Sequence, residues 1–237
     1  MDRIPAGAGS QPNGIAFDGA GRLWICDAGL NLVRCYDPIA DSWTVGVDAL
    51  DGEPLSRPND LAFDSIGNLV FTCPGNSRAN PIGLVACLRR DGRVQAIARG
   101  FYFPNGLAFT PDSKHLVVAE TRRQRLWRGQ WDSEHGHWLA PRPWASVGGN
   151  IGPDGMAFAA DGNLYVAILG AGEIKVVAPD GEVIEVIEVP GAKPTNCAFD
   201  PGGELGLVVT EAEHGSFLSI PSLRTRGAIL SRPILIK

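Results

Sequence analysis

The fold of this chain is decided by a repeated segment, whose clearest copy is Phe103-Pro104-Asn105-Gly106-Leu107-Ala108-Phe109. Similar segments occupy residues 11–17, 57–63, 152–158 and 193–199, and each places a small polar residue four positions before a phenylalanine. These polar residues, spaced by 46, 46, 49 and 41 residues, are Asn13, Asn59, Asn105, Asp154 and Thr195. A period of this length is typical of arrays in which each repeat is one supersecondary unit.

Within the third repeat, short apolar stretches alternate with turn residues. Residues 107–110 and 115–120 are predicted strands, and the sequence Pro-Asp-Ser-Lys between them favours a turn. Residues 125–131 alternate polar and apolar side chains, which indicates a half-exposed strand. A fourth strand is predicted near residues 143–147. Four antiparallel strands per repeat predict the blade of an all-β propeller.

We therefore expect a single β-propeller domain over residues 1–237, with five visible repeats. Two arrangements remain open: a five-bladed ring, or six-bladed geometry with one blade missing, completed by the termini or supplied by another chain. The residues after Thr195, including the apolar tail 228–236, are expected to supply strands two, three and four of the fifth blade. A missing blade would leave open sheet edges, so a homodimer is possible.

Composition excludes several classes of function. The net charge of −5 argues against general attraction to nucleic acid or to an anionic membrane. No apolar stretch has the length of a membrane span, and the N-terminus lacks the pattern of a secretory signal. The five cysteines form no Cys-x-x-Cys pair, so we expect reduced, buried thiols and a cytoplasmic protein.

The repeated polar residues are candidates for a binding site. Each begins the predicted innermost strand of its blade and should face the mouth of the central channel, where five blades converge. The second strands run back toward the same face, so Asp27, Cys73, Glu120 and Glu211 are also expected there. An isolated Asn before Gly is equally consistent with a structural turn. The basic cluster at residues 122–125 is either a solvated turn or a holder for an anionic substrate.

The ordered repeats resemble the senescence-marker-protein/gluconolactonase family of six-bladed propellers, which includes regucalcin and bacterial lactonases. The resemblance covers almost the whole chain. It rests on the following segments: Arg57-Pro58-Asn59-Asp60 with residues 67–72, Pro104-Asn105-Gly106, Pro153-Asp154-Gly155 with residues 161–164, and residues 195–199.

This resemblance implies a metal-assisted hydrolase of a sugar lactone or related cyclic ester, with a small-molecule substrate. Asn105 and Asp154 match metal ligands of the family, and Asp154 could also take a proton from water. Arg57 and Asn59 match positions that hold substrate oxygens, and Asn13 stands at the equivalent place in the first repeat. The implied cofactor is one divalent cation, Ca²⁺ first, with Zn²⁺, Mn²⁺ or Mg²⁺ as alternatives.

The sequence departs from the family near its N-terminus. The Glu-Gly-Pro-like motif that carries the family's glutamate ligand is not found, as if the first, Glu-bearing blade were lacking. With Asp154 as the one carboxylate of the ring, we expect weak metal binding, which Glu120 or Glu211 could strengthen. The alternative function is therefore a non-catalytic propeller that binds a small molecule or a partner protein at the channel mouth.

Overall fold

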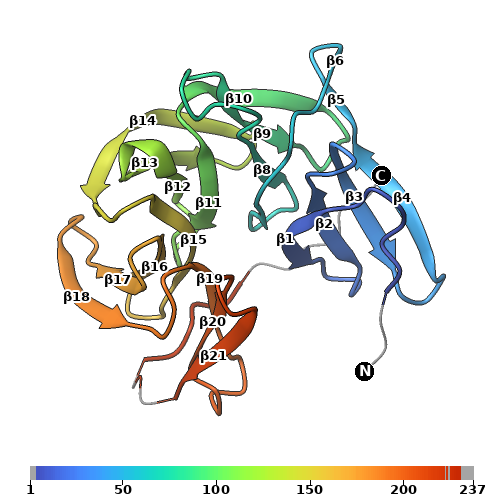
Figure 1. The fold of residues 1–237 in the computed structure, drawn as a ribbon. Coiled ribbons are helices and arrows are strands. Elements are labelled where there is room, and N and C mark those ends of the chain that lie inside the picture. The colour runs from blue at the N-terminus through green and yellow to red at the C-terminus, as the bar shows by residue number, and fades with distance from the viewer. Residues whose placement is uncertain (1–3, 222, 224, 231–237) are drawn as a thin grey trace.

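The computed structural model describes residues 4–221, 223 and 225–230, which form sheets arranged around a common axis (Figure 1). Four of these sheets have four antiparallel strands, taken consecutively from the chain. In chain order they are β1 (Pro12–Phe17), β2 (Leu23–Asp27), β3 (Leu32–Asp37) and β4 (Ser42–Val47); β7 (Leu61–Phe63), β8 (Leu69–Cys73), β9 (Gly83–Leu88) and β10 (Val94–Phe101); β11 (Pro104–Phe109), β12 (His115–Glu120), β13 (Arg125–Asp132) and β14 (His137–Ser146); and β15 (Gly152–Phe158), β16 (Leu164–Leu169), β17 (Glu173–Val177) and β18 (Val183–Glu188).

The fifth sheet has three strands in the described part of the chain. The remaining elements are β19 (Pro194–Phe199), β20 (Leu207–Glu211) and β21 (Ser216–Ile220) of that sheet, the hairpin β5 (Ala49–Leu50) and β6 (Glu53–Pro54), and the 3₁₀ turn η1 (Thr121–Arg123). The expected all-β propeller is thus confirmed, with the repeated segments forming the innermost strands. No helix in the described residues could cross a membrane.

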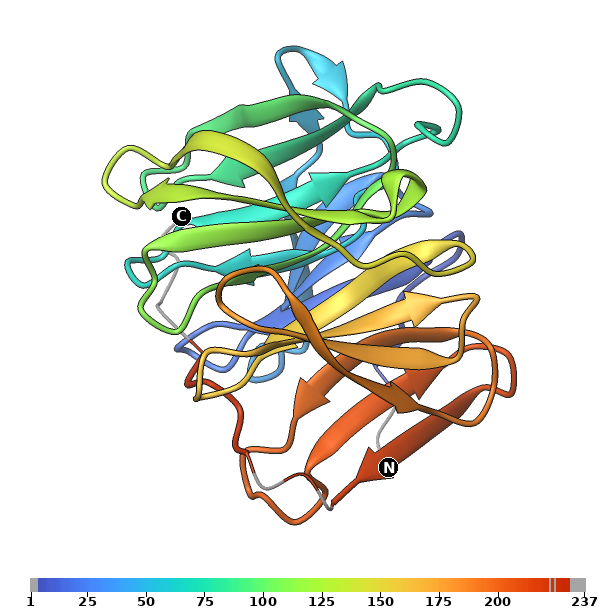
Figure 2. The same cartoon turned by 90° about the vertical axis from the view of Figure 1, so that its left-hand side faces the viewer.

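Position within a blade explains the sequence of each strand. The second strand β16 is buried along almost its whole length because it lies between neighbouring sheets, and it reads Leu-Tyr-Val-Ala-Ile-Leu. The outermost strand β18 is largely exposed and reads Val-Ile-Glu-Val-Ile-Glu. Figure 2 shows the sheets side by side, each strongly twisted from its inner to its outer strand.

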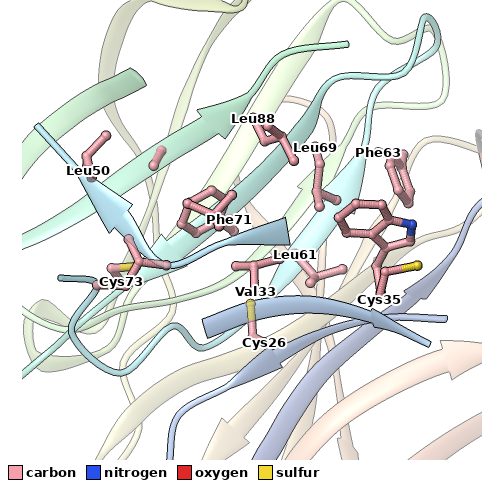
Figure 3. Packing of buried hydrophobic residues seen from close by; sticks show 14 residues of the cluster. Cys26, Val33, Cys35, Leu50, Leu61, Phe63, Leu69, Phe71, Cys73 and Leu88 are labelled. Atoms are coloured by element: carbon pink, nitrogen blue, oxygen red, sulfur yellow. The ribbon is translucent and has the colours of Figure 1, made fainter. Parts of the chain in front are cut away.

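Hydrophobic clusters join each blade to the next along the chain. In the first cluster, Val33 and Cys35 of the first blade pack with Leu61 and Phe71 of the second (Figure 3). Equivalent clusters join the second blade to the third, the third to the fourth and the fourth to the fifth. Burial of one such side chain contributes about 1.5–3 kcal/mol, so these clusters hold the blades in register.

No corresponding cluster of described residues joins the fifth blade to the first, and these two sheets stand at the ends of an arc (Figure 1). Part of the open flank of the first blade is covered by the chain before β1. The guanidinium of Arg34 donates to the carbonyl of Ala6 at 2.7 Å, and the indole of Trp43 donates to the carbonyl of Pro5 at 3.2 Å. On β1 itself, Phe17 remains 51% exposed.

The C-terminal segment differs from the expected fourth strand of the fifth blade. The amide of Ala160 donates to the carbonyl of Arg226 at 2.7 Å, and the amide of Ala228 donates to the carbonyl of Phe158 at 2.9 Å. The described tail therefore binds the end of the fourth blade, because the turn after β15 offers it free backbone groups. The apolar residues 234–236 lie outside the described residues. All five cysteines are buried and unpaired, as expected.

Candidate active site

A bulge at the start of the innermost strands shapes the mouth of the channel. In the third blade, Pro104 pairs with Glu120 and Leu107 pairs with Val118, so two residues oppose one on the neighbouring strand. The first, fourth and fifth blades show the same shift of register. The bulge brings the residue after each ring position against the next blade. A Cβ on Gly106 would lie 2.7 Å from the Cα of Gly155, so this close approach requires glycine.

Asn105 and Asp154 are joined by hydrogen bonds at the ring. Asn105 is only 3% exposed, and its amide donates to Thr121 Oγ1 at 3.1 Å. The Asn105 side chain also hydrogen bonds to the carboxyl group of Asp154. The hydroxyl of Thr121 in turn donates to the carbonyl of Pro153 at 2.7 Å. Thr121 therefore fixes both the amide of Asn105 and the main chain that carries Asp154.

Asp154 has an unusual protonation equilibrium. Asp154 is half-buried, and desolvation of its carboxyl group together with the nearby carboxylate of Asp60 raises its pKa to about 8, although the hydrogen bond from Asn105 acts in the opposite direction. Within the described chain, neither aspartate forms an ion pair with Lys, Arg or His. A carboxyl group with a pKa near neutrality can accept a proton from a reacting water and return it later.

Asp60 is a second carboxylate at the ring, and the expectation of a single one was wrong. Burial raises the pKa of Asp60 to about 6, even though the amides of Leu61 and Leu107 donate to it at 2.9 and 3.3 Å. The sequence carried a signal, because Asp60 stands where the first, third and fourth repeats have glycine. Its proximity to Asp154 depends on the arrangement of separate blades, which the repeat alone does not reveal.

The other predicted ring residues occupy different environments. Asn59 is half-buried, and its carbonyl accepts the amide of Gly14 at 2.7 Å. Arg57 is exposed, and its guanidinium lies 3.3 Å from the side-chain oxygen of Gln11. Asn13 is also exposed. The structure thus brings Asn105 and Asp154 into direct contact and leaves Asn13 outside that network. Substrate binding by Arg57 and Asn59 stays a prediction.

The carboxylates that end the second strands are engaged by the protein itself. Glu120 accepts the amide of Tyr102 at 2.8 Å through one oxygen, and Arg125 Nε and Trp127 Nε1 through the other, each at 2.7 Å. Asp27 and Glu211 likewise accept main-chain amides of the segments that enter β1 and β19. These groups position the innermost strands, so they are poorly placed to replace a metal ligand in the channel.

Glu211 also belongs to a cluster with Glu213 and His214, whose potential ligand atoms lie within 4.8 Å of one another. Both oxygens of Glu211 accept hydrogen bonds, from the amides of Lys193, Glu213 and His214 and from the His214 ring. A shared acceptor at a tight turn accounts for this geometry without an ion.

Below the ring, the channel opens into a cavity of about 270 Å³. Phenylalanines of four blades and the tail residues 228–230 line it, together with the polar residues Asp60, Asn196, Thr110 and Ser113. The cavity lining is therefore mainly apolar, with a few polar groups, among them Asp60 of the mouth.

Comparisons with known proteins place this geometry in context. A family model described as SMP-30/Gluconolactonase/LRE-like region matches residues 6–213. A gluconolactonase from Zymomonas mobilis is 32% identical, in an alignment that covers 85% of this chain and 62% of that protein. Diisopropyl-fluorophosphatase from Loligo vulgaris is 31% identical, with 89% of this chain and 71% of that protein covered.

Among solved structures, a gluconolactonase from Xanthomonas campestris matches with a TM-score of 0.74 and 29% identity. The match covers 85% of this chain and 69% of that protein. The alignments thus span less than two thirds of the Zymomonas enzyme and slightly more than two thirds of each of the other two relatives.

Proposed function

Because the chain belongs to the SMP-30/gluconolactonase/LRE-like family, we propose that it hydrolyses a sugar lactone or a related cyclic ester at the channel mouth. One observation carries this proposal: the half-buried carboxyl group of Asp154, with a pKa raised to about 8, is held by Asn105 at the mouth. The curated relatives named for gluconolactone hydrolysis support the choice of reaction.

Asp154 is the general base of the proposed reaction. It accepts a proton as a water oxygen attacks the carbonyl carbon, and the bond between that carbon and the ring oxygen then breaks. The proton returns from Asp154 to the departing ring oxygen, which gives an open-chain hydroxy acid. The amide of Asn59 and the guanidinium of Arg57 orient the oxygens of the substrate. General base catalysis of this kind is worth about 10²- to 10⁴-fold in rate.

The donors at the mouth fit a hard divalent cation. Asp60 and Asp154 place two carboxylates near each other, neither with a cationic side-chain partner in the described chain, and Asn105 adds an amide oxygen if its side chain turns. Oxygen donors of this kind suit Ca²⁺ best, with Mg²⁺, Mn²⁺ and Zn²⁺ as alternatives. When bound, such a cation would polarise the lactone carbonyl and lower the pKa of water.

The decisive experiment compares lactone hydrolysis by the wild type and by Asp154→Asn, with added Ca²⁺ and with EDTA. We expect the substitution to lower kcat by at least about 100-fold. Asp180→Asn, at an exposed turn, is the matched control and should retain activity. Calorimetric titration with each cation gives a second readout. Turnover that does not depend on Asp154 would overturn the proposal.

A protein that hydrolyses nothing yet binds a small molecule at the mouth would instead favour the non-catalytic alternative. The similarity to diisopropyl-fluorophosphatase makes a phosphorus ester a sensible second substrate for the same assay. Hydrolysis of diisopropyl fluorophosphate that exceeds lactone hydrolysis would move the proposal to that class of ester.

A further inference from the structure

Four arginines stand along the mouth on the second and third blades, and we call this set (Arg57, Arg78, Arg122 and Arg123) the arginine arc. All four are exposed. Hydrogen bonds connect the segments that carry them. The amide of Gly75 donates to the carbonyl of Ser56 at 3.1 Å, and the amide of Arg122 donates to the carbonyl of Tyr102 at 3.3 Å.

Ser77 links the middle of the arc to the site. Its hydroxyl accepts the amide of Phe103 at 2.9 Å, and Phe103 lies two residues before Asn105. The loop with Arg78 is thereby fixed against the segment that enters β11. The arginines thus lie on the same segments that position Asn59 and Asn105, or on segments hydrogen-bonded to them.

Aromatic rings hold two of these guanidinium groups. The guanidinium carbon of Arg123 lies 4.1 Å from the ring centroid of Tyr102, and that of Arg78 lies 5.5 Å from the centroid of Phe103. Stacking limits the freedom of a guanidinium while leaving its N–H groups available to a ligand. Phe103 itself has a φ of 61°, a conformation that is rare for a bulky residue and often found at functional sites.

The charges of the arc are not neutralised by the described protein. None of the four arginines forms an ion pair with a carboxylate in the described residues, whereas Arg125 nearby pairs with Glu120 at 2.7 Å. The chain as a whole is acidic, with a net charge of −5. The four unpaired positive charges therefore form a basic patch on an acidic protein, and this patch attracts anions to the mouth.

We propose that the substrate is an anionic lactone, whose carboxylate or phosphate group outside the lactone ring binds the arginine arc. This inference rests on the proposed lactone hydrolysis and names its substrate class. The carboxylate of Asp60 repels an anion from the centre of the ring. The anionic group thus lies over the arc, and the lactone carbonyl reaches Asp154. Guanidinium groups bind carboxylate and phosphate with the same paired geometry.

The test measures kcat/KM for three lactones: neutral glucono-1,5-lactone, its 6-phosphate, and glucaro-1,4-lactone, which carries a carboxylate. We expect the wild type to prefer one of the two anionic lactones, and the preferred one identifies the group. In the double variant Arg78→Gln/Arg123→Gln, kcat/KM for that lactone should fall about tenfold or more beyond the change for the neutral lactone.

Arg90→Gln is the matched control, because Arg90 is exposed in the turn between β9 and β10 at the opposite end of the blade. It should leave the preference unchanged. Sodium chloride at about 1 M should weaken the preference, since the screening length then falls to about 3 Å. Equal losses for neutral and anionic lactones in the double variant, or a wild-type preference for the neutral lactone, would overturn the inference.

The failure of lactone hydrolysis itself is distinguishable from failure of this inference. Calorimetric titration with 6-phosphogluconate and with glucarate measures binding of the anion without turnover. Binding by the wild type that is lost in Arg78→Gln/Arg123→Gln would support the arc even in a protein that hydrolyses no lactone. Absence of binding by either anion would overturn it.

Discussion

The tripeptide Pro-Asn-Gly occurs in both the first and the third blades, yet its two copies have different surroundings. Asn105 of the third blade is 3% exposed and bonded to Thr121 and Asp154. Asn13 of the first blade is exposed. The local backbone is similar, since both segments contain the same kind of bulge.

The difference lies in the neighbours of each copy. The backbone amide of Thr121 donates to the carbonyl of Phe103, and that of Ala28 donates to the carbonyl of Gln11. Thr121 and Ala28 therefore occupy equivalent positions in the two blades. Alanine, however, has no hydroxyl to bind Asn13. The next blade offers Asn59 to the first copy where it offers Asp154 to the third. A shared motif thus becomes a site only where the adjoining strands supply hydroxyl and carboxyl partners.

The largest effect should come from the packing of the repeated phenylalanine. Phe63 is 5% exposed and meets Trp24 of the preceding blade edge-on, with ring centroids 6.1 Å apart, whereas Phe17 is 51% exposed. We expect Phe63→Ala to lower the free energy of unfolding by about 3–5 kcal/mol. Phe17→Ala should lower it by less than about 1 kcal/mol, as measured by urea denaturation. Equal losses would show that another sheet covers the first blade in solution.

A smaller effect should separate the two asparagines in catalysis. We expect Asn105→Ala to lower kcat/KM for a lactone by about 100-fold, because a positioned polar group at the reacting centre is lost. Asn13→Ala, the same change in the same tripeptide, should alter kcat/KM less than about threefold, since Asn13 lies outside the hydrogen-bonded network. Steady-state kinetics measures both. Comparable losses would place Asn13 in the site.

The smallest effect concerns pH and the stability of the metal-free protein. The folded pKa of Asp154, about 8, lies above the unfolded value of about 3.9, so the folded state binds a proton that the unfolded state has released. Ionisation of Asp154 therefore costs stability progressively as pH rises between these values. In EDTA, we expect Asp154→Asn to raise Tm relative to the wild type at pH 8, by about 2–4 °C for each kcal/mol regained.

At pH 5 this relative gain in Tm should be several-fold smaller, because only the range between the unfolded pKa of about 3.9 and pH 5 then contributes to the cost. Asp60, with a pKa of about 6, loses its proton within the same range and remains in both proteins. Asp180→Asn provides the control at both pH values. A difference in Tm between Asp154→Asn and the wild type that does not change with pH would contradict the raised pKa.

Much of the site could be predicted from the sequence, whereas the residues that depend on contacts between blades could not. Asn105 and Asp154 each begin an innermost strand, so the repeat alone brought them to one mouth. Asp60 was not predicted because its position is a turn glycine in other repeats, and only the neighbouring blades make it a half-buried acid beside Asp154. Glu120 looked like a possible ligand, but the structure gives its oxygens to Tyr102, Arg125 and Trp127.

The sequence by itself determined the all-β blades, their order and the convergence of one polar residue from each, because apolar periodicity and turn residues are local signals. The tertiary structure alone decided which of those polar residues are buried, which meet one another and which arginines remain unpaired. Burial and charge coupling arise between strands that are some 50 residues apart in the chain, as Asn105 and Asp154 are. They depend on how closely each blade approaches the next, which a repeat pattern does not encode.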